Sequence, residues 1–302
     1  MKKPIKIALM SVAGLVVLVV AAAGVVSRLS DRKLHRVVQL PPLQVTLPTA
    51  EGQLEHGEYL FRTRGCMDCH SADGAGHVVI DEKDSGFFVR APNITPGGES
   101  PARTYTDTDW VRTLRHGVKP SGQPLLIMPS DDYARMADSD IAALVAYVRS
   151  LPPANTAAAE FSEFPLPIKA AYLFGAIKDA AEKIDHTAPP AAAVPDDLLA
   201  RGQYIAQGCT GCHGAHFSGG KIPGTPPAWP AAANLTSAPD SGMAHYTTKE
   251  QFKEMLRTGK RPDGSAVSTV MPFKALAYMS DAEVDALFTF LKSLDPRPFG
   301  GR

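Results

Sequence analysis

The chain of 302 residues contains four cysteines, which fall into two identical patterns with histidine. Residues 66–70 read CMDCH and residues 209–213 read CTGCH. Cys-x-x-Cys-His is the pattern at which haem c is attached. Two thiols one helical turn apart reach the two vinyl groups of one porphyrin, and the next residue places an imidazole beneath the iron. The sequence therefore predicts two covalently bound haem c groups, attached through Cys66, Cys69, Cys209 and Cys212.

Other uses of paired cysteines explain the pattern less well. Four cysteines of an exported protein can form two disulfides, and Cys-x-x-Cys also occurs as a thioredoxin-like redox pair. A zinc ribbon needs its two pairs about 15–20 residues apart, whereas 139 residues separate the two pairs here. None of these alternatives accounts for a histidine after both pairs.

A methionine follows each pattern at a constant distance. His70 and Met128 are 58 residues apart, as are His213 and Met271, and a proline follows both methionines. Equivalent residues of the two units are therefore 143 positions apart, and similar residues recur at this distance in the helical segment that ends each unit. Duplication at this length predicts two tandem domains rather than a solenoid.

Other side chains compete for the position opposite each histidine. Methionine is a common core filler, and the chain has nine of them. His77 and His116 are alternative iron ligands in the first unit, but neither has a histidine counterpart in the second unit. The shared spacing and the Met-Pro context favour Met128 and Met271.

Each unit has an N-terminal helix, the Cys-x-x-Cys-His pattern, an asparagine loop, an aromatic pair, a Met-Pro loop and a C-terminal helix. In this order both units resemble class I cytochrome c domains, over most of residues 52–153 and 196–297. The resemblance implies six-coordinate iron without an open position for a substrate, and a thioether ligand raises the reduction potential. We expect an all-α fold, with two tandem class I cytochrome c domains behind an N-terminal transmembrane helix. The implied axial ligands are His70 with Met128, and His213 with Met271.

The resemblance also implies a set of haem-pocket residues. A proximal imidazole needs its other N–H fixed, usually by a carbonyl, and the family's loop proline corresponds to Pro92, with Ala233 in the second unit. Tyrosine and tryptophan donors reach a haem propionate, whereas Phe252 has no donor, so we expect unequal midpoint potentials. Packing in the core is the alternative role of the aromatic residues. The alternative for the two arginines is that they are exposed charges on a helix. The implied pocket residues are Pro92, Asn93, Tyr105, Trp110, Arg115, Asn234, Tyr246 and Arg257.

Helical periodicity and caps predict the elements that hold these residues. Asp138–Leu151 has apolar residues at helical spacing, with Ser139 and Asp140 as candidate caps. Ser280 and Asp281 are the candidate caps of its counterpart. Small residues in each first helix predict close crossing with an aromatic residue of each last helix, Gly57 with Tyr147 and Gly202 with Phe290. Asn-x-Thr at 93–95 and 234–236 fits a glycosylation sequon, but we interpret it as loop structure.

The N-terminal segment predicts a membrane anchor. Ile7–Val26 is a run of 20 residues without charge, which matches a hydrocarbon core of about 30 Å. A signal peptide cleaved near residues 21–23 is the alternative, although its apolar region is usually shorter. Residues 1–36 carry seven basic side chains and one acidic side chain, Asp31, whereas the whole chain has no net charge, so the remaining residues are acidic overall. The absence of a net positive charge argues against a nucleic-acid partner. The expected divisions are 1–36 anchor, 37–51 spacer, 52–153 first domain, 154–195 connector and 196–302 second domain.

The connector has apolar residues at helical intervals from Phe161 to Ile184, which predicts an amphipathic helix. A Phe-Pro-x-Pro stretch before such a helix is similar to the connectors of the cytochrome subunits of membrane-bound alcohol and gluconate dehydrogenases. Those subunits generally carry three haem units, whereas this chain has two.

These features predict an electron-transfer protein rather than an enzyme, without a small-molecule substrate. We expect a single-pass protein of the bacterial inner membrane with both haem domains in the periplasm. Its expected partners are a dehydrogenase or quinol-oxidising protein and a downstream cytochrome or terminal oxidase. A di-haem peroxidase, which needs one iron without a strong distal ligand, and the cytochrome subunit of a C-family haem–copper oxidase are the alternatives.

Overall fold

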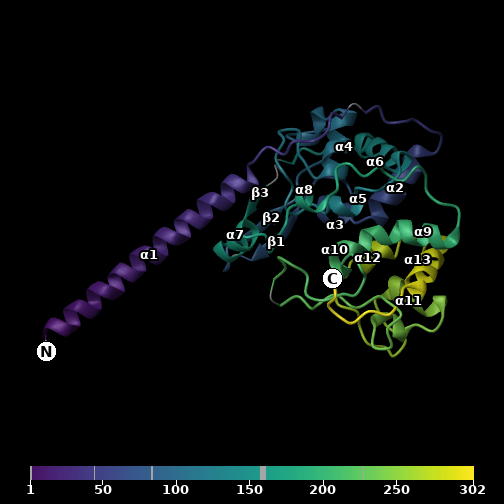
Figure 1. Cartoon of the computed structure of the whole chain (residues 1–302). Helices are drawn as coiled ribbons and strands as arrows, with labels where there is room; N and C mark the ends of the chain where they lie inside the picture. The colour runs from purple at the N-terminus through teal and green to yellow at the C-terminus, as the bar shows by residue number, and fades with distance from the viewer. Residues whose placement is uncertain (1, 44, 83, 157–160, 227) are drawn as a thin grey trace.

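One long helix projects from two helical units that pack against each other (Figure 1). The computed structural model describes residues 2–43, 45–82, 84–156, 161–226 and 228–302. The long helix is α1 (Lys2–Leu34). The first unit contains α2 (Gln53–Thr63), α3 (Cys66–His70), η1 (Pro101–Thr104), α4 (Asp107–His116), α5 (Ser130–Tyr133) and α6 (Asp138–Ser150). The second contains α9 (Leu198–Ala206), η2 (Gln207–Cys209), α10 (Thr210–His213), η3 (Gly242–His245), α11 (Lys249–Thr258), α12 (Phe273–Leu276) and α13 (Asp281–Ser293).

The first and last helices of each unit cross at glycine, as the sequence predicts. A Cβ added to Gly57 of α2 would collide with the Ala143 carbonyl and lie 2.6 Å from Cβ of Tyr147 in α6. Gly202 of α9 meets α13 in the same way, at the Ala286 carbonyl and 2.6 Å from Cβ of Phe290. Only a residue without a side chain allows these backbones to approach so closely.

The middle helices of the two units share their start and stop signals. Thr106 begins α4 and Thr248 begins α11, each in a capping box with the residue three positions later. Both helices end at a glycine in the left-handed region, Gly117 (φ 62°) and Gly259 (φ 70°). A capping box satisfies two backbone donors at once, and glycine adopts positive φ without strain.

The caps of the last helices differ between the units. The Ser280 side chain accepts a hydrogen bond from the Glu283 amide at the start of α13, as predicted. The prediction of Ser139 and Asp140 as caps of α6 is wrong, because Ala137 is the cap residue and makes no side-chain bond. Asp140 lies inside the helix and bonds to other elements.

A small sheet accompanies the helices, and the sequence did not predict it. Its strands are β1 (Val78–Glu82), β2 (Phe87–Arg90) and β3 (Phe161–Glu163), all antiparallel in the order β1-β2-β3. Phe87 and Val89 of β2 are buried, whereas Phe88 and Arg90 alternate with them on the other face. The predicted helical fold of two tandem units behind an N-terminal helix is confirmed, and the small sheet is an addition to it.

The connector is not one long helix. Phe161–Glu163 is strand β3, and only α7 (Leu166–Leu173) and α8 (Ala180–Lys183) are helical. Pro165 precedes α7, and Gly175, with φ 81°, follows it, so the backbone itself interrupts the apolar periodicity.

The connector contacts the segment just after α1 through an ion pair whose carboxylate is buried. Arg36 lies 2.6 Å from the fully buried carboxylate of Asp179, and the Tyr172 hydroxyl donates to the same carboxylate at 2.7 Å. Although burial acts to raise the pKa of Asp179, these bonds hold it below its ordinary value. The stretch Leu9–Leu34 of α1 contains an 18-residue window with a mean hydropathy of 2.7 and suffices, by length and composition, to cross a membrane.

The segment after α1 is extended, but it packs along the first unit instead of standing apart from it. The Val38 amide donates to the Gly122 carbonyl at 2.9 Å, and the Leu47 amide donates to Asp107 at 3.0 Å. Val45 and Leu47 pack against the first core. The predicted spacer therefore forms part of the surface of the first unit.

Candidate haem sites

The two predicted proximal histidines end short helices and have equivalent partners. Nδ1 of His70 donates to the Pro92 carbonyl at 2.9 Å, and Nδ1 of His213 donates to the Ala233 carbonyl at 2.7 Å. Because a carbonyl only accepts, Nδ1 carries the proton and Nε2 carries the lone pair that can bind a metal ion. Burial lowers the pKa of His213, which favours this neutral form.

Glycines bring the carbonyl loop beneath each histidine. The amides of Gly76 and Gly219 donate to the His70 and His213 carbonyls, both at 2.9 Å. Both glycines have φ near 70° (73° and 72°), and an added Cβ would lie 2.6 Å from the carbonyl oxygen of Pro92 or Ala233. Alanine in place of proline thus leaves the acceptor where it is, since the main chain provides it.

The predicted pocket asparagines are structural supports of the same loop. The Asn93 side chain is fully buried, donates to the Ala154 carbonyl at 2.9 Å and accepts from the Thr95 amide at 2.9 Å. Asn234 makes the equivalent bonds to the Arg297 carbonyl and the Thr236 amide. These buried side chains are inaccessible to glycosylation, and they tie each loop to the segment after the last helix.

The aromatic pairs have the same geometry in both units but different chemistry. Tyr105 and Trp110 contact edge to face with ring centroids 5.4 Å apart, and Tyr246 and Phe252 do so at the same distance. The indole Nε1 of Trp110 is buried and has no hydrogen-bond partner among the described residues. Such a donor fits a carboxylate of a group bound in this pocket. Phe252 has no donor to offer.

The two predicted methionine ligands pack against equivalent cores. Met128 lies against the first core and Met271 against the second, both only partly buried. The residue two positions later donates its amide to each methionine carbonyl, Ser130 at 2.9 Å and Phe273 at 2.8 Å. Four further methionines are buried and pack within these two cores: Met136, Met243, Met255 and Met279.

The competing histidines have other contacts. Nδ1 of His77 lies 3.1 Å from the Ser71 hydroxyl. His116 ends α4, and its Nδ1 lies 3.0 Å from Nδ1 of His186 in the connector. Burial and the nearby positive charges lower the pKa of His116 to about 4. The pair therefore joins the first unit to the connector.

The two predicted pocket arginines hold the chain that follows each methionine loop. Arg115 donates to the Met136 carbonyl at 2.7 Å and to Asp138 at 2.6 Å. Arg257 donates to the carbonyls of Ala277 and Met279 and to Asp281. Arg115 is only 7% exposed, so its interpretation as an exposed helix charge is wrong.

The cysteines have the properties expected of attachment points rather than of a redox pair. All four lie within the described residues, and none forms a disulfide. Burial raises the pKa of Cys66 and of Cys209 to about 12, so neither thiol is activated as a thioredoxin-like thiolate. Paired thiols, a neutral imidazole and a buried unpartnered donor together fit haem c.

Two tyrosines join the units in a nearly symmetric interface. The Tyr59 hydroxyl of α2 donates to Glu283 at 2.6 Å and accepts from the Ser280 amide at 2.9 Å. The Tyr204 hydroxyl of α9 donates to Asp140 at 2.6 Å and accepts from the Ala137 amide at 2.9 Å, which are the equivalent positions in α6. Repeated sequence thus forms a self-complementary contact between the two units.

Charged groups bond to the carboxylates on both sides of this interface. Arg64, two residues before Cys66, lies 2.8 Å from Glu283, and both side chains are largely buried (11% and 17% exposed). His56 pairs with Asp140 at 2.8 Å, and the hydrogen bond to Asp140 raises the pKa of His56. The interface therefore fixes the attachment segment of the first unit against the second unit.

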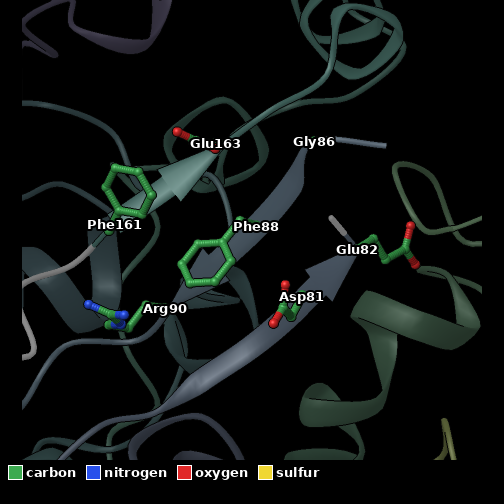
Figure 2. Close-up of a pocket in the computed structure, with 7 residues that line it drawn as sticks. All are labelled: Asp81, Glu82, Gly86, Phe88, Arg90, Phe161 and Glu163. Atoms are coloured by element: carbon green, nitrogen blue, oxygen red, sulfur yellow. The ribbon is translucent and has the colours of Figure 1, made fainter. Parts of the chain in front are cut away.

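A pocket of about 380 Å³ lies elsewhere, on the sheet. Figure 2 shows Phe88 and Arg90 on β2 between Asp81 and Glu82 of β1 and the residues of β3. None of the predicted haem residues lines this pocket.

Comparison with known proteins identifies the repeated unit. The cytochrome c family model matches residues 54–152 and 199–295. The chain is 26% identical over 296 residues to the fructose dehydrogenase cytochrome subunit of Gluconobacter japonicus. This alignment covers 88% of this chain and 57% of that protein. It is 29% identical over 268 residues to the gluconate 2-dehydrogenase cytochrome c subunit of Pantoea cypripedii, covering 80% and 59%. A diheme cytochrome c-type protein of Cereibacter sphaeroides is 30% identical over 177 residues, covering 54% and 57%.

The chain thus spans little more than half the length of these curated relatives. The matched segments hold both Cys-x-x-Cys-His patterns and both Met-Pro loops within two helical units. The chain therefore belongs to the cytochrome c family, with two cytochrome c domains in tandem, and is similar to the cytochrome subunits of sugar, sugar-acid and alcohol dehydrogenases.

Proposed function

We propose that the protein is a membrane-anchored carrier of single electrons with two haem c groups. Cys66 and Cys69 attach one group, and Cys209 and Cys212 attach the other. Haem c, when bound, supplies one-electron chemistry at iron. The chain contributes the axial ligands His70 with Met128 and His213 with Met271, the carbonyls that orient the imidazoles, and cores that exclude water.

The observation that carries this proposal is the equivalence of the two histidine sites. Both histidines donate Nδ1–H to a loop carbonyl, at 2.9 and 2.7 Å, which leaves Nε2 as the metal-binding atom. Both methionines follow their histidine by 58 residues and lie partly buried at equivalent cores. Two ligand pairs of this kind support electron transfer rather than substrate turnover at an open iron.

The pocket residues have graded roles in this proposal. The buried Nε1 of Trp110 would donate to a propionate of the first haem, and Tyr105 and Tyr246 would lie beside the propionates. Pro92 and Ala233 orient the imidazoles, whereas Asn93 and Asn234 hold the loops. Arg115 and Arg257 act indirectly, by fixing the chain after each methionine loop.

Optical spectra of methionine variants test the ligation. Met128→Ala and Met271→Ala should each convert one haem from the low-spin, six-coordinate form to a form that binds cyanide or carbon monoxide. Met136→Leu, a change at a buried core methionine of the first unit (7% exposed), should leave both haems low-spin. Low-spin spectra that persist in Met128→Ala and Met271→Ala would assign the sixth ligand to other residues.

The proposed setting is the periplasmic side of a bacterial inner membrane. The apolar helix α1 precedes both units, and its basic end is tied to the connector by Arg36, Lys33 and Lys169. The cytochrome subunits to which the chain is similar belong to dehydrogenases, so the proposed donor is a dehydrogenase or quinol-oxidising protein. The proposed acceptor is a cytochrome or terminal oxidase.

Isolation of the intact complex from native membranes tests the partners. A dehydrogenase subunit recovered in constant ratio to this chain is the expected result. A copper oxidase in its place would assign the protein to a terminal oxidase instead.

A further inference from the structure

Two neighbouring residues of the first unit contact the haem-attachment segments of both units. Asp132 and Tyr133 lie in the short helix α5, soon after Met128. The Tyr133 hydroxyl donates to the Arg64 carbonyl at 2.9 Å, two residues before Cys66. On the other side, Asp132 accepts from the Gly211 amide at 3.2 Å, between Cys209 and Cys212.

The contact with the second unit includes a further bond. The Thr210 hydroxyl lies 3.4 Å from the Asp132 carboxylate, so both residues between Cys209 and Cys212 bond to it. The opposite contact does not exist, because Ala275 and Leu276 occupy the positions of α12 that correspond to Asp132 and Tyr133. The contact of Asp132 is therefore a charged contact of the interface that has no symmetric counterpart.

We propose that Asp132 couples the two cytochrome c domains, by placing a negative charge of the first domain on the haem-attachment loop of the second. This inference rests on the proposed function. A nearby carboxylate stabilises the oxidised, more positive form of an iron centre and disfavours its reduction. The second domain thus owes part of its redox potential to a residue of the first.

The surroundings of Asp132 make this charge responsive to protons. Burial, together with the charge of Asp131, raises the pKa of Asp132 to about 7, while the bonds from Gly211 and Thr210 and the charge of Lys183 act in the opposite direction. Cys209 and Cys212 also lie close enough to interact with Asp132 electrostatically, and as thioether links to the proposed haem they would carry no charge. With haem bound, reduction of the second iron by an electron donor would favour the uptake of one solvent proton by the Asp132 carboxyl group.

A spectroelectrochemical titration of the full-length protein tests the proposal. Asp132→Asn keeps an oxygen acceptor for Gly211 and removes the charge. At pH 8 it should favour reduction of the second haem about tenfold, a rise of about 59 mV for one electron, and leave the first haem less affected. It should also abolish the pH dependence of the second haem between about pH 6 and 8. Met271→His, which replaces a thioether by a nitrogen ligand, lowers the potential of the second haem and assigns it.

Asp131→Asn provides the matched control. Asp131 is the next residue and pairs with Lys183 at 3.4 Å, so its change should shift the second haem far less than Asp132→Asn. Equal shifts in the two variants, or no shift in Asp132→Asn, would overturn the proposal. Haem content and low-spin spectra are measured on the same samples, and loss of either would instead contradict the proposed function.

Discussion

At the scale of single residues, equivalent positions carry the same geometry with different side chains. The carbonyl acceptor is preserved whether proline or alanine supplies it, because the interaction belongs to the main chain. The donor at Trp110 is not preserved, because it belongs to a side chain that Phe252 lacks. The two proposed pockets therefore share the carbonyl that orients the histidine and differ in the side-chain donor that a haem carboxylate would meet.

Replacing Trp110 by phenylalanine tests this difference. A hydrogen bond to a charged group contributes about 1.5–3 kcal/mol. Its loss leaves the propionate more negative, which favours the oxidised iron. Trp110→Phe should lower the reduction potential of the first haem and leave that of the second unchanged. The equilibrium constant for reduction of the first haem should fall about tenfold, measured by a spectroelectrochemical titration. One potential for both haems of the unchanged protein would count against unequal pockets.

The residue after each proximal histidine has a backbone conformation that favours glycine. Ser71 has φ 65° and ψ 164°, and Gly214 has φ 80° and ψ 161° at the equivalent position. A side chain in this region costs on the order of 1–3 kcal/mol. Ser71→Gly should therefore raise the free energy of unfolding of the first unit by about 1 kcal/mol, measured by urea denaturation. Gly214→Ser should lower that of the second unit, and a loss of stability in Ser71→Gly would contradict this assignment.

At the scale of elements, paired helices that cross at glycine organise each unit. The crossing of α2 with α6 and of α9 with α13 could be predicted from sequence, because each unit has a glycine in its first helix and an aromatic residue in its last helix. The caps of α4, α11 and α13 follow from local sequence as well. These features depend on residues within one or two helices, which is why a repeated sequence reveals them.

Elements made from distant segments could not be predicted in this way. Strand β3 pairs with β2 from about 70 residues further along the chain, so no hairpin marks this pairing, whereas β1 and β2 are consecutive antiparallel strands. The roles of Arg115 and Asp132 were also missed, since their partners lie in other elements and no spacing rule relates them. Local periodicity predicts helices and cores, whereas polar contacts between elements need the folded chain.

Substitution at the first crossing tests the importance of close helix contact. Gly57→Ala places a methyl group on the Ala143 carbonyl and should destabilise the first unit by about 2 kcal/mol, measured by urea denaturation. Gly208→Ala is the matched control, since nothing lies within 4 Å of its added Cβ. Equal stability of Gly57→Ala and the unchanged protein would show that the helices separate without cost.

At the scale of the whole molecule, α1, the connector and two domains are joined by polar contacts. Arg36 and Asp179 join α1 to the connector, Tyr59 and Tyr204 join the domains, and His116 and His186 join the connector to the first domain. Such contacts hold the two haem-attachment segments at fixed positions relative to each other and to α1. This arrangement suits electron transfer between sites that must remain close.

The histidine contact makes the docked connector sensitive to acid. Because the pKa of His116 falls from its ordinary value of 6.5 to about 4 on folding, the unfolded chain binds more protons between these values. Stability should therefore fall as the pH decreases from about 6.5 toward 4. His116→Gln should flatten this part of the urea-midpoint profile, and His77→Gln should not. An unchanged profile in His116→Gln would assign the acid sensitivity to other groups.

The intact mass of the protein tests most directly whether two haem c groups are covalently attached. The protein is purified from cells that mature c-type cytochromes, and its mass is measured under denaturing conditions that remove non-covalent ligands. The proposed covalent attachment predicts a mass excess of two haem groups, and of one haem group in the variant with Cys209→Ala and Cys212→Ala. An unchanged excess in that variant, or any number other than two in the unaltered chain, would contradict it.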